Sequence, residues 1–141
     1  MFSENYIEYV KKTANPEYTL EMAACALMEE FNEFDSEPSI DELGDVYYQF
    51  VLFAYLTGID LKDINYVDGA CDNVQTILDI TSQFKKLKTR GKQLDLTLIS
   101  NKLKALYSDI IDATDVEGLT IDEVEKYNID KLNARYGNVN E

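Results

Sequence analysis

The sequence predicts an all-α fold, and three observations lead to this class. The 141 residues include only two prolines and six glycines, too few for the many turns of a β-sheet protein. A hydrophobic fraction of 45% argues for a buried core and against disorder. Apolar residues recur at three- and four-residue steps, the period of a helix with one buried face. We therefore expect one domain, an antiparallel bundle of about five to six helices.

The first half of the chain predicts three helices, over 2–13, from 16 or 17 to 34, and from 39 to 57. Asn15-Pro16 favours the second start, because Asn caps helices and Pro suits the first turn. Ser39 to Glu42 has the form of a capping box and opens the third helix, which Gly58 closes. The loop 35–38 is short, so the second and third helices form an antiparallel hairpin.

The second half predicts a short helical segment over 61–66 and three further helices. These run from 67 to about 88, from about 96 to 113, and from a second capping box at Thr120 to Tyr136. A polar tail, 138–141, follows Gly137. Segments 58–64 and 118–124 resemble each other and each follows an amphipathic hairpin, which suggests a duplication; any two Gly-terminated helices would also share this pattern.

The charge balance excludes some partners. With a net charge of −14, the chain is not expected to bind nucleic acid or an anionic membrane directly, since both need clustered Lys and Arg. Such acidity means solubility, metal binding or mimicry of nucleic acid. The N-terminus has no signal-peptide pattern, and the most apolar run, 46–56, is too short to span a bilayer. We expect a soluble, cytoplasmic protein.

The residue types that are missing narrow the chemistry. The chain has no histidine, so the commonest general base and zinc ligand is unavailable. Cys25 and Cys71 are isolated, and we expect both to be buried free thiols in a reducing compartment. Any metal site must rest on carboxylate oxygens, which suit Mg²⁺, Mn²⁺ or Ca²⁺.

Two carboxylate pairs are the strongest chemical signal. Glu30 and Glu33 end the second predicted helix, and Glu42 and Asp45 begin the third. Each pair has i,i+3 spacing and so lies on one side of its helix, next to the apolar stripe. The hairpin brings the pairs together, where two like charges at 4 Å cost roughly 4 kcal/mol at an effective dielectric of 20. The arrangement predicts a bound divalent cation.

Other interpretations of the same acids remain open. An acidic sequence produces such spacings by chance, and Glu30 and Glu33 can simply lie on a solvated face. Glu42 can be the capping partner of Ser39. Tyrosines are also numerous, and most fall on the core faces of the predicted helices. Tyr47 and Tyr48 lie one turn beyond the second acidic pair, and one of the two can contact a nucleotide base.

The motifs around these acids resemble a known family. Leu27 to Glu33, followed by Asp41 to Val46, resembles the EExxE…ELGD signature of MazG-like nucleoside triphosphate pyrophosphohydrolases. Segment 9–16 is similar to the opening helix of small, phage-type members, and 118–136 is similar to their closing helix. The pieces occur in the family's order along the chain.

The resemblance implies an all-α pyrophosphohydrolase fold and a reaction. That reaction is hydrolysis of an NTP or dNTP to the monophosphate and pyrophosphate with Mg²⁺, or with Mn²⁺, in the cytoplasm of a bacterium or a phage-infected host. The implied metal ligands are Glu30, Glu33, Glu42 and Asp45. The implied catalytic residues are Glu29, Glu30 and Glu33, with Glu29 supporting the ligands or positioning water. The implied substrate-binding residues are Asn128, Lys131, Arg135 and Tyr136.

The chain departs from the family pattern in two places. Only residues 34–41 separate the two acidic pairs, a shorter connection than the family usually has. Segment 65–117 looks like a second family hairpin, in which the four ligand positions fall on Thr76, Asp79, Lys102 and Ala105. This half cannot hold a metal by itself.

The second departure suggests a fused pair of hairpins. A metal-binding half, 1–64, precedes a degenerate half, 65–117, and a closing helix, 118–136. The degenerate half would supply what a second subunit otherwise supplies, although MazG-like proteins commonly form homodimers. Two other functions stay open. One is a nucleotide-binding or sequestering protein without turnover, and the other is an acidic interaction protein that mimics nucleic acid.

Overall fold

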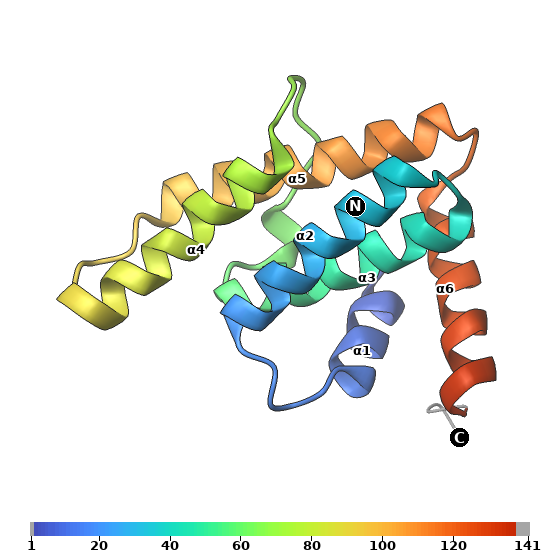
Figure 1. The fold of residues 1–141 in the computed structure, drawn as a ribbon, viewed down its shortest axis with the longest axis horizontal. Coiled ribbons are helices and arrows are strands. Elements are labelled where there is room, and N and C mark those ends of the chain that lie inside the picture. Colours follow the sequence, from blue (N-terminus) through green and yellow to red (C-terminus); the bar gives the residue numbers. More distant parts are fainter. Residues whose placement is uncertain (1, 138–141) are drawn as a thin grey trace.

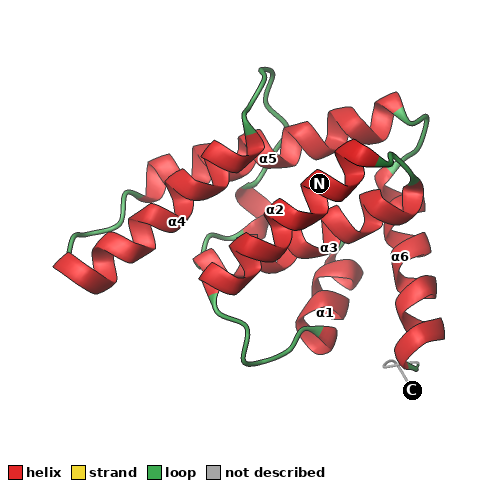
Figure 2. Ribbon diagram, viewed as in Figure 1, coloured by secondary structure: helices red, strands yellow, loops and turns green. Residues whose placement is uncertain are grey.

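The computed structural model describes residues 2–137, and within this range it contains helices and no strand (Figures 1 and 2). This confirms the predicted all-α class. The predicted polar tail, 138–141, lies outside the described residues. The elements are α1 (Glu4–Thr13), α2 (Leu20–Ser36), α3 (Ile40–Thr57), the short 3-10 helix η1 (Leu61–Asp63), α4 (Asn73–Arg90), α5 (Leu96–Val116) and α6 (Ile121–Tyr136).

The prediction that α2 starts at Asn15-Pro16 is wrong, because Asn15 forms a turn instead. Its side-chain oxygen accepts a hydrogen bond from Glu17 N at 2.9 Å, and its carbonyl accepts one from Tyr18 N at 3.0 Å. Thr19 is the actual N-cap and accepts from Met22 N at 3.2 Å. Asn followed by Pro serves a turn as well as a helix start, and here the turn prevails.

The predicted start of α4 at residue 67 is also wrong. Gly69 has a φ of 137°, which no helix can contain. Val67 N donates to the Ser108 hydroxyl at 2.8 Å, so 67–72 runs as a loop against α5. Asp72 then caps α4 by accepting from Gln75 N. The predicted helical segment at 61–66 shortens to η1, and α5 runs three residues past 113, its predicted end.

The helix α3 is the central element of the bundle. It contacts α1, α2, α5 and α6, and α4 packs on α2 and α5 (Figure 1). Because neighbours cover it on several sides, its buried residues are not confined to one stripe. The largest fully buried side chains on α3 are Tyr47, Phe50, Phe53 and Leu43. The hairpin of α4 and α5 extends away from this core, with its tip at residues 90–96 (Figure 1).

The first and last helices meet beside α3 through buried polar contacts. The Tyr6 hydroxyl donates to Asn128 Oδ1 at 2.7 Å, and the Tyr9 hydroxyl donates to Asn133 Oδ1 at 2.9 Å. Glu125 is buried and accepts from the Tyr47 hydroxyl at 2.9 Å. Burial raises the pKa of Glu125, and the Tyr47 hydrogen bond partly opposes that rise. These contacts hold α6 at a fixed position on α3.

Gly44 lets α3 and α6 approach closely. A Cβ at this position would lie 3.2 Å from Asn128 Nδ2 and 3.3 Å from Asn128 Cβ. Asn128 cannot move aside easily. The Tyr6 hydroxyl holds its side-chain oxygen, and its Cβ can move only if the whole of α6 moves. The glycine of the Glu-Leu-Gly-Asp motif therefore has a packing role in this protein.

We expect Gly44→Ala to lower the free energy of unfolding by about 1 kcal/mol. Alanine gains about 1 kcal/mol of helix propensity, but overpacking against Asn128 costs more than that. Urea denaturation of the two proteins measures the difference. A more stable variant would show that α6 shifts to accept the methyl group.

No helix among the described residues has the length and apolar character needed to cross a membrane.

Candidate metal centre and ligand cavity

Acidic side chains gather where α2 ends and α3 begins. Glu30, Glu33 and Glu42 each have a carboxylate oxygen within 4.8 Å of the others. Asp41, Glu42 and Asp45 form a second such group that shares Glu42. The structure thus brings the four predicted ligands into one cluster and adds Asp41, which the sequence pattern did not single out.

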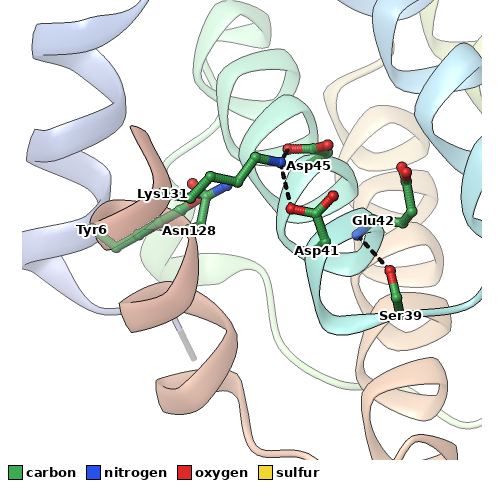
Figure 3. A network of polar contacts seen from close by, with 7 residues as sticks. All are labelled: Tyr6, Ser39, Asp41, Glu42, Asp45, Asn128 and Lys131. Atoms are coloured by element: carbon green, nitrogen blue, oxygen red, sulfur yellow. Dashed lines mark hydrogen bonds and ion pairs between the residues drawn. The ribbon is translucent and has the colours of Figure 1, made fainter. Parts of the chain in front are cut away.

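Glu42 joins this cluster and does not complete a capping box. Ser39 caps α3 by accepting from Glu42 N at 3.1 Å, but the Glu42 side chain points away from Ser39 (Figure 3). The box predicted at Thr120 is complete, since the Glu123 carboxylate returns to Thr120 N at 3.1 Å. The two similar sequences differ because Glu42 faces the end of α2, whereas Glu123 faces solvent.

The raised pKa of Glu30 shows that ionising the carboxylates of this cluster is unfavourable when no cation is bound. Burial raises its carboxyl pKa to about 7, with further contributions from the charges of Asp45, Glu33 and Glu42. Burial, followed by the charges of Asp45, Glu33 and Asp41, also raises the pKa of Glu42. Ionised acids in this position need a compensating positive charge.

The donor set fits a hard divalent cation. Glu30 Oε2 and Glu42 Oε2 are buried and have no hydrogen-bond partner in the part of the chain that the structure describes. Native proteins seldom leave buried polar atoms unpaired, so each such atom needs an explanation. Carboxylate oxygens are the ligands that Mg²⁺ and Mn²⁺ prefer. A cation held by Glu30, Glu33 and Glu42 would pair these atoms.

Lys131 neutralises the other side of the cluster. Its ammonium lies 2.8 Å from Asp45 Oδ1 and 2.9 Å from Asp41 Oδ1 (Figure 3). Burial alone lowers the pKa of this lysine, but hydrogen bonds to Asp45 and Asp41 raise it above its ordinary value. Lys131 was predicted to meet substrate phosphates. In the structure it holds α6 against the first turns of α3.

A cavity of about 430 Å³ opens beside the acids, between α1, α3 and α6. This volume is within the range of small-molecule binding sites. Glu30 and Asp45 belong to both the cluster and the cavity wall. The full lining is Tyr9, Lys12, Thr13, Glu30, Asp45, Tyr48, Gln49, Asn128, Leu132, Tyr136 and Gly137.

The remaining predicted site residues are dispersed. Asn128 and Tyr136 line the cavity, although Asn128 is 1% exposed and accepts from Tyr6. Arg135 is exposed on a separate groove with Tyr127 and Asp130. Glu29 is exposed on α2 and belongs to neither carboxylate group.

The prediction of a buried Cys25 is wrong. This thiol is exposed and donates to Glu29 Oε1 at 3.5 Å. Ala24 and Leu27 turn toward the core, and a rotation of about 100° per residue carries Cys25 to the outer face of α2. Cys71 is partly buried, with its Sγ 3.6 Å from the Ala105 carbonyl.

Sequence reasoning missed Tyr9, Lys12 and Gln49 among the residues that line the cavity. Tyr9 and Lys12 lie one turn apart at the end of α1, and Gln49 lies one turn after Asp45 on α3. The i,i+4 spacing of Asp45 and Gln49 was a usable signal, since it puts both on one face of the helix. No local pattern in the sequence indicated that α1 lines the cavity, because that depends on where α1 packs.

The second hairpin carries an ion pair where the first carries acids. Lys102 Nζ on α5 lies 3.2 Å from Asp79 Oδ2 on α4. These are two of the four positions that correspond to the acidic ligands in the sequence comparison of the hairpins. Hydrogen bonds from Gln75 and Lys102 lower the pKa of Asp79, the opposite of the shift at Glu30.

The Glu30 pKa predicts how stability depends on pH in the metal-free protein. The folded carboxyl binds its proton more tightly than the unfolded one, whose pKa is 4.5. Stability is therefore greatest below pH 4.5 for this group and is lost as pH rises through about 7. With solvent screening, we expect a loss of roughly 1–2 kcal/mol.

Urea denaturation in EDTA at pH 5 and at pH 8 measures this loss. Saturating Mg²⁺ should flatten the dependence, because the cation binds the ionised carboxylates. A metal-free protein that gains stability between pH 5 and pH 8 would contradict the assignment.

No protein-family model matches the chain, and neither a curated protein nor a solved structure matches it. The site residues and the motif resemblance are thus the grounds for a functional proposal. Chemically, the site offers an unneutralised carboxylate group for a cation and an adjoining cavity for an organic ligand. A ligand that carries both phosphates and a ring system fits this combination.

Proposed function

We propose that the protein is a metal-dependent nucleoside triphosphate pyrophosphohydrolase. It would hydrolyse an NTP or dNTP to the monophosphate and pyrophosphate, with Mg²⁺ or Mn²⁺. One observation carries the proposal: Glu30, Glu33 and Glu42 converge within 4.8 Å, with buried unpaired oxygens on two of them. The resemblance of 27–33 and 41–46 to the MazG-like signature supports the reaction assigned to this cluster.

The residues of the chain have distinct tasks in this reaction. Glu30, Glu33 and Glu42 would hold the cation, and Asp45 would add an oxygen from the cavity side. The bound cation would neutralise triphosphate charge and lower the pKa of a water molecule. With no histidine in the chain, a carboxylate of this group would accept the proton of the attacking water if a side chain serves as the base.

Lys131 and Lys12 would have different roles at the site. Lys131 is already engaged by Asp41 and Asp45, so its main effect is to fix their positions. Lys12 is exposed at the end of α1 and lines the cavity. It can meet a phosphate group without breaking an ion pair, which makes it a better phosphate ligand than Arg135.

The first test measures pyrophosphate release from a panel of NTPs and dNTPs with Mg²⁺, with Mn²⁺ and with EDTA. Glu33→Gln should abolish release, and Glu37→Gln should not, because Glu37 is exposed and outside both carboxylate groups. Release that persists in EDTA, or no release from any nucleotide by folded protein, would reject the proposal.

A second candidate is a protein that binds or sequesters a nucleotide without turnover. The observation in its favour is Lys131, which takes up Asp41 and Asp45 and leaves fewer free acids for cations. This function predicts that nucleotides raise the melting temperature while no pyrophosphate forms. The same panel, read by thermal shift, separates the two functions.

We infer a cytoplasmic protein of a bacterium or of a phage-infected host, acting as a monomer or as a homodimer. The exposed free thiol of Cys25 is compatible with a reducing compartment. Sedimentation at concentrations above and below those of the assay would give the oligomeric state. The acidic mimic of nucleic acid is less well supported, because Glu30 and Glu42 are half-buried and converge with the exposed Glu33 instead of lining an open face.

A further inference from the structure

Gln49 has a buried acceptor with nothing to bind. Its side-chain oxygen Oε1 is buried and has no hydrogen-bond partner within residues 2–137. The residue lies on α3, one turn after Asp45, and both line the cavity. A buried amide oxygen left without a donor destabilises the free protein, so a ligand donor is the natural explanation.

Two of the tyrosine hydroxyls around the cavity, those of Tyr9 and Tyr48, have already donated their protons. Tyr9 donates to Asn133 Oδ1 at 2.9 Å. The Thr13 hydroxyl donates to the Tyr9 carbonyl at 2.8 Å, so the bond of 2.7 Å between Thr13 and Tyr48 must use the Tyr48 proton. Both phenol oxygens can therefore only accept a further hydrogen bond.

The cavity has the size and the surfaces that a planar ring needs. Its volume is about 430 Å³, and the rings of Tyr9, Tyr48 and Tyr136 are part of its lining. Leu132 adds an apolar side chain from α6. Aromatic side chains stack on nucleobases without regard to sequence, so selectivity must come from the polar groups.

Several polar groups of the cavity lining are acceptors that can take a further donor. These are Gln49 Oε1 and the phenol oxygens of Tyr9 and Tyr48, whereas Asp45 already accepts from Lys131 and the exposed Lys12 supplies a donor. A ring edge with an exocyclic amino group donates to Gln49 Oε1 as the side chain stands, whereas a carbonyl at the same place would require the amide to turn over and present its nitrogen. Cytosine and uracil differ in this one group, and so provide the sharpest comparison.

We propose that Gln49 is a specificity-determining residue, and that the cavity takes a nucleotide whose base carries an exocyclic amino group, as in cytosine or adenine. The amino group donates to Gln49 Oε1. This inference rests on the proposed function for the nucleotide itself, but it does not require turnover. It gives the unpaired amide oxygen a partner that the protein alone lacks.

The test compares the affinities of the non-hydrolysable α,β-imido analogues of dCTP and dUTP by calorimetry with Mg²⁺. For the natural chain we expect the cytosine analogue to bind roughly tenfold more tightly, the effect of about one hydrogen bond. Gln49→Met keeps the side-chain length and removes the amide, and should reduce the ratio to about twofold or less. Gln93→Leu, in the exposed loop between α4 and α5, is the control and should keep the tenfold ratio.

A second variant, Gln49→Glu, and a second measurement, the melting temperature without ligand, show whether Gln49→Met acts through the lost amide or through misfolding. Gln49→Glu retains only acceptors and should keep the preference for cytosine. Without ligand, Gln49→Met should melt at a higher temperature than the natural chain, because it no longer buries an unpaired oxygen. Equal affinities in the natural chain, a preference for uracil, binding of neither analogue, or an unchanged ratio in Gln49→Met would each overturn the inference.

Pyrophosphate release, measured in parallel, keeps the two proposals apart. If release is absent while Gln49→Met removes the preference for cytosine, the inference stands and the proposed reaction fails. If release is present and the ratio does not respond to Gln49→Met, the reaction stands and the inference is overturned.

Discussion

Replacing Glu30 with glutamine should lower metal-dependent pyrophosphate release at least about a hundredfold, since a cation at such a site contributes several kcal/mol of transition-state stabilisation. The same substitution should raise the free energy of unfolding of the metal-free protein at pH 8 by about 1–2 kcal/mol. The cause is the same for both effects. Burial, followed by the neighbouring like charges, raises the pKa of Glu30 to about 7, and a neutral amide removes both the desolvation cost and the repulsion together with the ligand charge.

The pyrophosphate-release assay and urea denaturation, run on one protein preparation, test this pair of effects. Urea denaturation in EDTA at pH 5 and pH 8 should show the gain at pH 8 only, since natural Glu30 is largely protonated at pH 5. Glu29→Gln is the matched control, because Glu29 is exposed and outside both carboxylate groups. A loss of stability at pH 8 would mean that Glu30 has a structural role and is not held in strain for a cation.

Replacing Lys131 with methionine should destabilise the metal-free protein by about 1–2 kcal/mol. The lysine side chain is 14% exposed and bridges Asp41 and Asp45, which are 44% and 27% exposed. Its loss leaves the two carboxylates beside Glu42 without the ion pairs that Lys131 makes. The exposure of the aspartates keeps the cost below that of a fully buried pair.

Divalent metal should restore part of the stability lost in Lys131→Met. A cation compensates the added negative charge, so Mg²⁺ should stabilise this variant more than it stabilises the natural chain. Lys126→Met is the control, since Lys126 and its partner Asp130 are 78% and 65% exposed and should contribute within about 0.5 kcal/mol. Equal Mg²⁺ stabilisation of both proteins would show that the cation site is not coupled to Lys131.

Local sequence signals predicted most of the fold, and they failed where one pattern serves two structures. Ser39, Thr120 and Gly58 marked helix ends correctly because caps depend on a few neighbouring residues. Asn15 formed a turn instead of a cap, and Gly69 kept 67–72 out of α4.

The acidic cluster was predictable, whereas the cavity was not. The i,i+3 pairs and the short loop between α2 and α3 bring Glu30 and Glu42 together through local geometry alone. The cavity needs α1 and α6, whose contact between Tyr6 and Asn128 joins residues 122 positions apart. A pattern within one helix holds no information about such a contact. For that reason the ion pairs of Lys131 with Asp41 and Asp45 could not be foreseen from the sequence.

The contact between the two outer helices has a consequence for how the protein is made. A ribosome releases α1 first and α6 last, and the cavity needs Tyr9 from one and Leu132 from the other. The acids of the cluster, by contrast, all lie on α2 and α3, so they are together once α3 has emerged. During synthesis the nascent chain therefore carries a set of clustered acids before it has a pocket, and the cavity is complete only when α6 docks.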